Sequence, residues 1–341
     1  MTRELGVAVV GLGFGANHAR VLTELEGARL AAVCDSDPDR LEAVSKARGT
    51  TAYADYREML RRERLDAVIV AVPAALHVEV SLAAIENGCA ALVEKPLAAS
   101  YAEGCRLVAA AEAAGAPFMA GHIERFNPAL RELRRRVLAG EAGQVLSIAA
   151  RRMAAARVPP RDVNVVHDSA VHEIDAMRWV LGARVWEVFA AAHSGVVRPQ
   201  ENAVSALLRF APLGDGPAPI GTLEVSWLFP RRVRDLTVVG TRGSFFLDYA
   251  AQTLEFQEMP PERTGPVQGW SLGRAEAAPE ARPIPIEPRE QLVEELKAFL
   301  GAVRNREPMP VANEDALAAL AIADAITQSA RTGRPVAPLK G

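Results

Sequence analysis

The pattern of apolar and polar residues divides the chain into two parts. In the first part, short runs that are apolar at almost every position alternate with longer amphipathic stretches. The apolar runs are residues 6–10, 30–34, 67–72, 90–93 and 118–120. The amphipathic stretches are residues 18–26, 38–48, 55–62, 77–87 and 101–114. Strands that are apolar throughout are buried on both faces, so this alternation predicts a parallel sheet covered by helices on both sides.

A different rhythm follows the helix-like stretch at residues 128–139. Strand-like segments now succeed one another, with one helix-like stretch, residues 169–181, among them. The segments are residues 145–152, 186–193, 203–210, 220–228, 233–240 and 244–249. Turn signals join several of them, for example Gly214-Asp215-Gly216, and this indicates a largely antiparallel sheet.

Together the two patterns predict an α/β protein of two domains, a number that 341 residues also favour. Residues 1–122 form the parallel-sheet domain in this prediction. Residues 123–341 form an α+β domain with a largely antiparallel, open-faced sheet. The proline-rich residues 259–289 predict a long exposed loop, and two closing helices follow. These helices are predicted at residues 291–304 and 315–331.

Composition excludes several classes of protein. Hydrophobic residues make up 50% of the chain, charged residues 24%, and the net charge is −3. These values argue against disorder and against a nucleic-acid binder that depends on a general positive field. The scattered Cys34, Cys89 and Cys105 form no C-x-x-C pair, which argues against a disulfide scaffold or a zinc site. The apolar stretch 67–78 is too short to span a bilayer. We therefore expect a cytoplasmic protein with no metal and with neither nucleic acid nor membrane as a partner.

A glycine-rich turn lies between the first predicted strand and the first predicted helix, with Gly11, Gly13 and Gly15 at its centre. Such a turn lets the backbone approach a pyrophosphate, and the helix N-terminus offers unpaired N–H groups. A tight turn without any ligand is the alternative. Asp35 ends the second strand, where an acid accepts hydrogen bonds from the adenosine ribose. Its charge would repel a 2′-phosphate, which favours NAD over NADP; Arg40 is the nearby residue that could oppose this preference.

Two further groups of residues carry candidate chemistry. Lys95 follows the fifth strand at the carboxyl edge of the sheet, where it could stabilise a developing alkoxide. Asp168, His172 and Asp175 lie on one arc of a predicted helix, and a histidine held by an acid four residues earlier is a plausible general base. The alternatives are a surface lysine, a structural histidine and an N-cap aspartate.

Taken together, these residues resemble the Gfo/Idh/MocA family of nicotinamide-dependent sugar oxidoreductases, over essentially the whole chain. The motifs are Glu94-Lys95-Pro96, Gly121-His122, Asp168-x-x-x-His172-x-x-Asp175 and the closing Ser329–Pro335 segment, besides the glycine turn. The resemblance implies a Rossmann domain and an open-faced second domain whose sheet often supports oligomers, so we expect a homodimer or homotetramer. The glycine turn is one residue shorter than usual, which leaves its phosphate contacts open.

The resemblance also implies roles for individual residues. Lys95, Asp168 and His172 act in catalysis. The residues expected to bind the cofactor are Gly11, Gly13, Phe14, Gly15, Ala16, Asp35, Ser36, Ala71, Val72, Pro73, His77, Glu94 and Lys95. The residues expected to bind the substrate are His122, Arg125, Asn127, Arg161 and Trp227.

A further set of motifs is Asn17-His18-Ala19-Arg20-Val21, Gly121-His122-Ile123-Glu124-Arg125-Phe126-Asn127-Pro128, Arg161-Asp162-Val163, and Trp227 with Arg231-Arg232-Val233-Arg234 before Leu236-Thr237-Val238. By these motifs the likeness within the family is greatest to UDP-N-acetylglucosamine 3-dehydrogenases, and the substrate expected from it is UDP-N-acetylglucosamine, oxidised at C3. Arginines that flank the loop before the catalytic helix suit its two phosphates, although they could equally be solvated surface residues. They are Arg151, Arg152, Arg157 and Arg161. The alternatives are an inositol or free-sugar dehydrogenase, a glucose–fructose type transhydrogenase and a non-catalytic NAD(H)-binding sensor.

Overall fold

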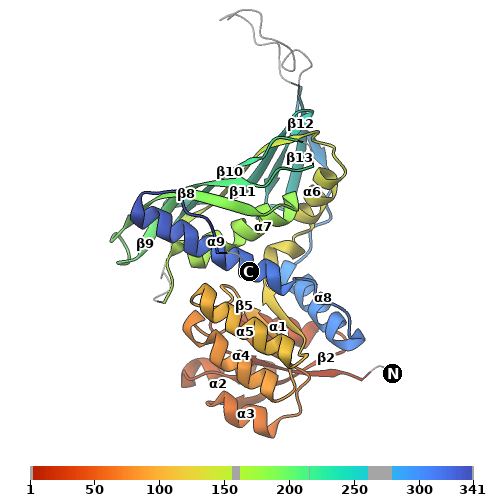
Figure 1. Cartoon of the computed structure of the whole chain (residues 1–341). Helices are drawn as coiled ribbons and strands as arrows, with labels where there is room; N and C mark the ends of the chain where they lie inside the picture. Colours follow the sequence, from red (N-terminus) through yellow and green to blue (C-terminus); the bar gives the residue numbers. More distant parts are fainter. Residues whose placement is uncertain (1–2, 156–161, 215, 260–278, 340–341) are drawn as a thin grey trace, which may run out of the picture.

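The computed structural model describes residues 3–155, 162–214, 216–259 and 279–339. Two layered units lie one above the other in Figure 1, and the helices α8 (Gln291–Asn305) and α9 (Asn313–Thr332) lie near their junction. No helix of the described residues is long and apolar enough to cross a membrane.

The first unit is a six-stranded parallel sheet with the strand order β3-β2-β1-β4-β5-β6. Its strands are β1 (Leu5–Val10), β2 (Ala28–Cys34), β3 (Thr51–Tyr53), β4 (Ala67–Val70), β5 (Ala90–Glu94) and β6 (Phe118–Gly121). Its helices are α1 (Gly15–Glu24), α2 (Pro38–Arg48), α3 (Tyr56–Arg62), α4 (His77–Glu86) and α5 (Tyr101–Ala113). This order is that of a Rossmann fold, whose ligands bind at the carboxyl ends of the strands. The apolar pattern predicted every strand except the short β3, which is exposed at the sheet edge.

The second unit is an eight-stranded sheet with the order β14-β13-β12-β11-β7-β10-β9-β8. Its strands are β7 (Val145–Ala155), β8 (Val185–Ser194), β9 (Glu201–Phe210), β10 (Ile220–Ser226), β11 (Leu228–Gly240), β12 (Gly243–Asp248), β13 (Thr253–Glu258) and β14 (Arg282–Ile284). All neighbouring pairs are antiparallel except β7 and β10. The prediction of a largely antiparallel sheet is therefore confirmed.

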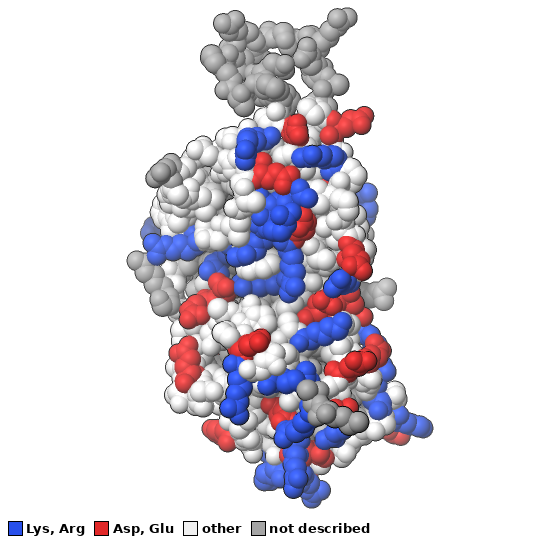
Figure 2. Space-filling model, turned by 90° about the vertical axis from the view of Figure 1, so that its right-hand side faces the viewer, with Lys and Arg blue, Asp and Glu red and all other residues white. Residues whose placement is uncertain are grey.

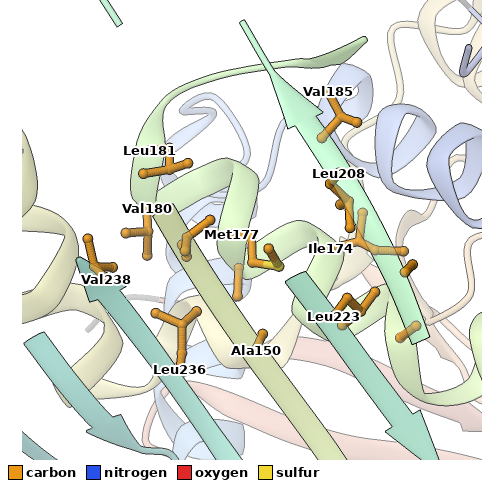
Figure 3. Packing of buried hydrophobic residues seen from close by; sticks show 14 of the residues in the cluster. Ala150, Ile174, Met177, Val180, Leu181, Val185, Leu208, Leu223, Leu236 and Val238 are labelled. Atoms are coloured by element: carbon orange, nitrogen blue, oxygen red, sulfur yellow. The ribbon is translucent and has the colours of Figure 1, made fainter. Parts of the chain in front are cut away.

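One face of this sheet is covered by α6 (Pro128–Leu138), α7 (Val171–Leu181) and α9. Figure 3 shows the α7 side chains Met177 and Val180 against Leu236 and Ala150 of the sheet. Along each strand the buried residues alternate with residues on the other, open face. Large apolar side chains stay exposed there, for example Phe189, Leu207 and Ile220. Such a face suits a protein contact, and the expected oligomerisation through it stays a prediction.

In the second unit the sequence prediction also missed strand β13, and the structure differs from the expectation in two further places. Strand β14 pairs with β13 inside the stretch that the prolines predicted to be loop, because Leu254 and Phe256 bury Ile284 at the sheet edge. Helix α8 was assigned to the second domain, but its apolar face lies in the core of the first. There Leu296 and Phe299 contact the side of the sheet that α1 covers.

Charged side chains of both signs are interspersed over the face shown in Figure 2. Ion pairs on the surface have this mixed character, for example Arg135 with Glu132 and Arg136 with Glu141. This face therefore carries no broad field of a single sign.

Candidate active site

The glycine turn forms the wall of a cavity at the carboxyl end of β1. Gly11 has φ +88°, and a Cβ there would lie 2.5 Å from the carbonyl oxygen of Ala71. A Cβ on Gly13 would meet nothing within 4 Å, so this part of the turn faces open space. Phe14 is half exposed beside it, Ala16 is partly buried in the first turn of α1, and Gly15 is buried against Val9. The turn therefore holds its backbone close to the β4 loop and leaves an approach to the helix N-terminus open.

The cavity has a volume of about 500 Å³. Among the residues that line it are Gly11, Gly13, Asp35, Ser36, Arg40, Tyr56, Ala71, Val72, Pro73 and Glu79. The structure thus brings together seven of the residues predicted to bind the cofactor, from the ends of β1, β2 and β4. The size and the glycine cradle fit the adenosine half of a dinucleotide.

Asp35 is held in place by hydrogen bonds on both carboxylate oxygens. Oδ2 accepts from the backbone N–H of Leu12 at 2.6 Å, and Oδ1 accepts from that of Asp37 at 2.8 Å. Arg40 also reaches both oxygens, with Nε 3.1 Å from Oδ2. Arg40, the residue that could oppose a preference for NAD, is therefore paired with Asp35, the residue that favours NAD.

Lys95 and Asp168 meet across the two units. The Lys95 Nζ donates to the Asp168 carbonyl oxygen at 2.7 Å and to Asp168 Oδ1 at 3.2 Å. Trp227 Nε1 and Ser169 Oγ donate to Asp168 Oδ2 at 3.1 and 2.9 Å. Burial would raise the pKa of Asp168, but Lys95 and these two donors outweigh burial and hold the pKa below its usual value. The two contacts with Asp168 fix the Lys95 ammonium group at the junction.

His172 lies in the first turn of α7, just after a π-helical turn at Val166–Ala170 that contains Asp168. The carboxylate of Asp168 is bonded to Lys95, Ser169 and Trp227, and none of the described hydrogen bonds joins it to His172. The helical spacing had led us to expect that Asp168 orients the imidazole. In the structure its carboxylate contacts Lys95 instead.

The imidazole of His172 is neutral at physiological pH. Burial is the largest cause that lowers its pKa well below the usual value, and Arg152, Lys95, Arg234 and His122 lower it further. The buried Nδ1 has no hydrogen-bond partner among the described residues. A neutral imidazole keeps a nitrogen lone pair that can accept a proton.

A buried chain of contacts supports Lys95 from behind, and sequence reasoning missed it. His18 Nε2 lies 2.7 Å from Glu94 Oε1, and Glu94 Oε2 accepts from the Lys95 backbone N–H at 3.2 Å. Burial would raise the pKa of Glu94, but His18 and Lys95 outweigh burial and lower the pKa. Glu94, predicted to bind the cofactor, thus positions the strand end that carries Lys95. The histidine four residues after Phe14 was visible in the sequence, but its partner 76 residues away was not.

His77, also predicted to bind the cofactor, is buried and faces protein carbonyls. Its Nδ1 lies 2.8 Å from the Pro96 oxygen and its Nε2 lies 2.8 Å from the Val72 oxygen. The ring therefore joins the loops after β4 and β5. Oδ2 of Asp162, in the second unit, accepts a hydrogen bond from the Ala74 N–H at 2.7 Å and so joins the loop after β4 to that unit.

The predicted substrate residues have different surroundings. Trp227 lies at the site through its bond to Asp168, while Arg161 lies outside the described residues. His122, Arg125 and Asn127 are at most 4% exposed. Arg125 binds Asp175 through two nitrogens, at 2.8 and 2.6 Å. These three side chains therefore lie in the protein interior and not on an open surface of the site.

Asn127 has a clear structural role in this segment. Its Oδ1 accepts from the Ala129 N–H at the start of α6, and its Nδ2 donates to the Tyr249 oxygen at 3.1 Å. The residue is thus a helix cap that also joins α6 to the second sheet. The segment from His122 to Asn127 therefore forms a structural junction, and the substrate role expected for its residues stays a prediction.

Family comparisons agree with this architecture. The family described as "Oxidoreductase family, NAD-binding Rossmann fold" (GFO_IDH_MocA) matches residues 5–122, and the GFO/IDH/MocA C-terminal domain matches residues 130–246. Together the two matches span more than half of the chain. The fold and the site define an oxidoreductase with an NAD-binding Rossmann domain. The chain belongs to the Gfo/Idh/MocA family.

Individual proteins share parts of this likeness. Inositol 2-dehydrogenase 4 of Saccharopolyspora erythraea is 37% identical over 210 residues, which cover 58% of this chain and 62% of the relative. The scyllo-inositol 2-dehydrogenase (NAD(+)) of Bacillus subtilis is 29% identical and covers 98% of this chain and 97% of its own length. The matches to the first few curated relatives span less than two thirds of those proteins.

A solved structure tests the subgroup that the sequence suggested. UDP-N-acetylglucosamine 3-dehydrogenase GnnA from Acidithiobacillus ferrooxidans has a TM-score of 0.79 at 22% identity, and the match covers 96% of this chain and 97% of that one. Identity this low shows the shared fold alone.

Replacing Asp35 with serine is expected to weaken the preference for NAD⁺. The ribose would lose its acceptor, and Arg40 would lose its carboxylate partner and become free to bind a 2′-phosphate. We expect kcat/KM with NAD⁺ to fall at least about tenfold and kcat/KM with NADP⁺ to rise by a similar factor. Steady-state kinetics with both cofactors measures this. The double variant Asp35→Ser/Arg40→Gln is the control. If kcat/KM with NADP⁺ rises as much in the double variant as in Asp35→Ser, Arg40 does not bind the 2′-phosphate.

Proposed function

We propose that this protein is an NAD-dependent dehydrogenase that transfers a hydride between nicotinamide and a ring carbinol of a cyclic polyol or sugar. The observation that carries the proposal is the fixed Lys95 ammonium group, bonded to Asp168 and close enough to the neutral His172 to lower its pKa. An ammonium donor beside an uncharged base is what oxidation of an alcohol requires.

Each of the three residues has a separate task in the oxidation. Lys95 donates a hydrogen bond to the carbinol oxygen and stabilises negative charge as it develops there. Asp168 holds Lys95 in place, because its carboxylate and its carbonyl both accept from Nζ. His172 accepts the hydroxyl proton, which its lowered pKa leaves it free to do at neutral pH. The nicotinamide, when bound, supplies the hydride acceptor.

The substrate we propose differs from the one that the sequence favoured. The named relatives with the higher identities are inositol dehydrogenases, whereas the nucleotide-sugar enzyme shares the fold at 22% identity. This favours the alternative kept from the sequence, a cyclic polyol or free sugar. A substrate of this kind does not need the loop arginines Arg157 and Arg161, which lie outside the described residues.

A substrate panel tests the proposal. Purified protein with NAD⁺ is expected to form NADH with at least one compound among myo-inositol, D-glucose, D-glucuronate and UDP-N-acetylglucosamine, followed by NADH absorbance. Turnover confined to UDP-N-acetylglucosamine would restore the nucleotide-sugar assignment. Absence of turnover with every compound, while NAD⁺ still binds in calorimetry, would contradict the dehydrogenase and favour a non-catalytic NAD(H)-binding protein.

A further inference from the structure

Arg234 lies on the helix-covered face of the second sheet, at the end nearest the site. It is directly opposite Arg152 in the antiparallel pair of β11 and β7, just as Leu236 is opposite Ala150. Opposite residues point to the same face. Figure 3 shows Leu236 and Ala150 beneath α7, and Arg152 binds Glu173 of that helix. Arg234 therefore follows directly after the last apolar pair of this core.

The guanidinium of Arg234 is partly buried and has no acidic partner. No hydrogen bond or ion pair joins it to any side chain in the part of the chain that the structure describes. The nearby acids are already committed: Glu124 and Glu173 both bind Arg152, and Asp168 binds Lys95. The buried Arg125 and Arg152 are paired with carboxylates, and Arg131 and Arg134 donate to backbone oxygens.

This arrangement is costly for the free protein. Like charges directly opposite each other on two strands repel, and a partly desolvated cation without a partner costs further free energy. Burial lowers the pKa of Arg234 to about 10, and Arg152 and Arg232 add to the shift while Glu124 and Glu173 partly oppose it, so the group is still a cation at neutral pH. An unpaired cation kept at such a place is explained if a ligand supplies the missing anion.

Arg234 also lies near the helix that carries His172, because Arg152, directly opposite it, binds Glu173, the residue after His172. Arg234 lowers the pKa of His172, together with Arg152 and Lys95. An anion bound to Arg234 would therefore lie beside the base and the ammonium group that we assign to the chemistry. The guanidinium fork suits a carboxylate or a phosphate, each of which can accept two parallel hydrogen bonds.

We propose that the substrate is an acidic ring compound, a sugar or polyol bearing a carboxylate or a phosphate, and that Arg234 binds this anionic group. The inference rests on the dehydrogenase function proposed above and narrows its substrate class. A neutral polyol such as free inositol would leave Arg234 unpaired in the complex.

Pairs of compounds that differ in the anionic group test the proposal. They are D-glucuronate and D-glucose, myo-inositol 1-phosphate and myo-inositol, and UDP-N-acetylglucosamine and N-acetylglucosamine. We expect the wild type to favour an anionic member in kcat/KM by roughly tenfold to a hundredfold, the effect of one charged hydrogen-bonding pair. Arg234→Gln should remove this preference mainly through KM, and Arg234→Lys should keep part of it. The control is Arg209→Gln, an exposed arginine on the open face of the same sheet.

The pH profile gives a second readout, which reports whether the charge of Arg234 acts on His172. Because burial, Arg152, Lys95, Arg234 and His122 all lower the pKa of His172, loss of the Arg234 charge should raise that pKa. The base then loses its proton only at higher pH, so the acidic limb of kcat/KM should move to higher pH in Arg234→Gln. It should stay in place in Arg234→Lys.

The outcomes separate this inference from the proposed function. Equal turnover of neutral and anionic members, or a preference that Arg234→Gln leaves unchanged, overturns the anion site while the dehydrogenase stands. If nothing turns over, calorimetry of the same compounds with the NADH complex decides the matter. Binding of an anionic member that Arg234→Gln abolishes supports the site although the dehydrogenase fails. No preference for an anion in either measurement overturns the site.

Discussion

Replacing Lys95 with alanine is expected to lower kcat by about a thousandfold while NADH still binds. The ammonium group is the donor that stabilises charge on the carbinol oxygen, and loss of one such group costs two to three orders of magnitude in comparable sites. The glycine turn and Asp35 are made by other segments, so the cofactor site should be unaffected. Single-turnover kinetics and NADH fluorescence titration measure the two effects separately.

The control for this experiment is Lys297→Ala, because Lys297 is exposed on α8 and forms an ion pair with Glu294 of the same helix. It should leave kcat unchanged. A Lys95→Ala protein that kept most of its turnover would remove Lys95 from the mechanism. A variant that lost NADH binding as well would show instead that the residue mainly shapes the cofactor site.

Replacing Arg125 with methionine is expected to lower the free energy of unfolding by about 3–5 kcal/mol, because a buried charge would lose its partner. Arg125 binds the carboxylate of Asp175, which is 1% exposed, and also reaches Asp315 at 2.9 Å. Urea unfolding followed by circular dichroism measures the loss. The matched control is Arg135→Met on α6, whose exposed pair with Glu132 should contribute less than about 1 kcal/mol.

The same variant should depend on pH in a defined direction. Burial would raise the pKa of Asp175, but His122 and Arg125 outweigh burial and hold it below its usual value. In the wild type this ion pair therefore stabilises the fold above the ordinary pKa of aspartate, and the contribution is lost as pH falls through the lowered pKa. Without Arg125 the pKa of Asp175 should rise. At low pH Asp175 is protonated in both proteins, so the difference in the free energy of unfolding between wild type and variant becomes smaller.

Arg125→Met also separates two roles for this residue. The sequence motif predicted that Arg125 binds substrate, whereas the structure buries it among acids. Stability equal to that of the wild type, together with a raised KM for substrate, would favour the first role over the second.

The sequence by itself determined the features that depend on neighbouring residues. Continuous apolar runs indicated the parallel strands because a strand covered on both faces needs apolar residues at every position. The glycine turn was recognisable because Gly11 needs a positive φ that other residues rarely adopt. Asp35 and Lys95 were placed correctly at the ends of β2 and β5, since both positions follow directly from where the strands stop.

Only the tertiary structure decided which charges are paired. Asp168 stands four residues before His172, yet it binds Lys95, which is 73 residues away. The fold pairs Arg125 with two acids, Asp175 and Asp315, whereas none of the described acids forms an ion pair with Arg234. The reason is physical: the free energy of a buried charge depends on what distant segments place beside it, and no local pattern records those neighbours.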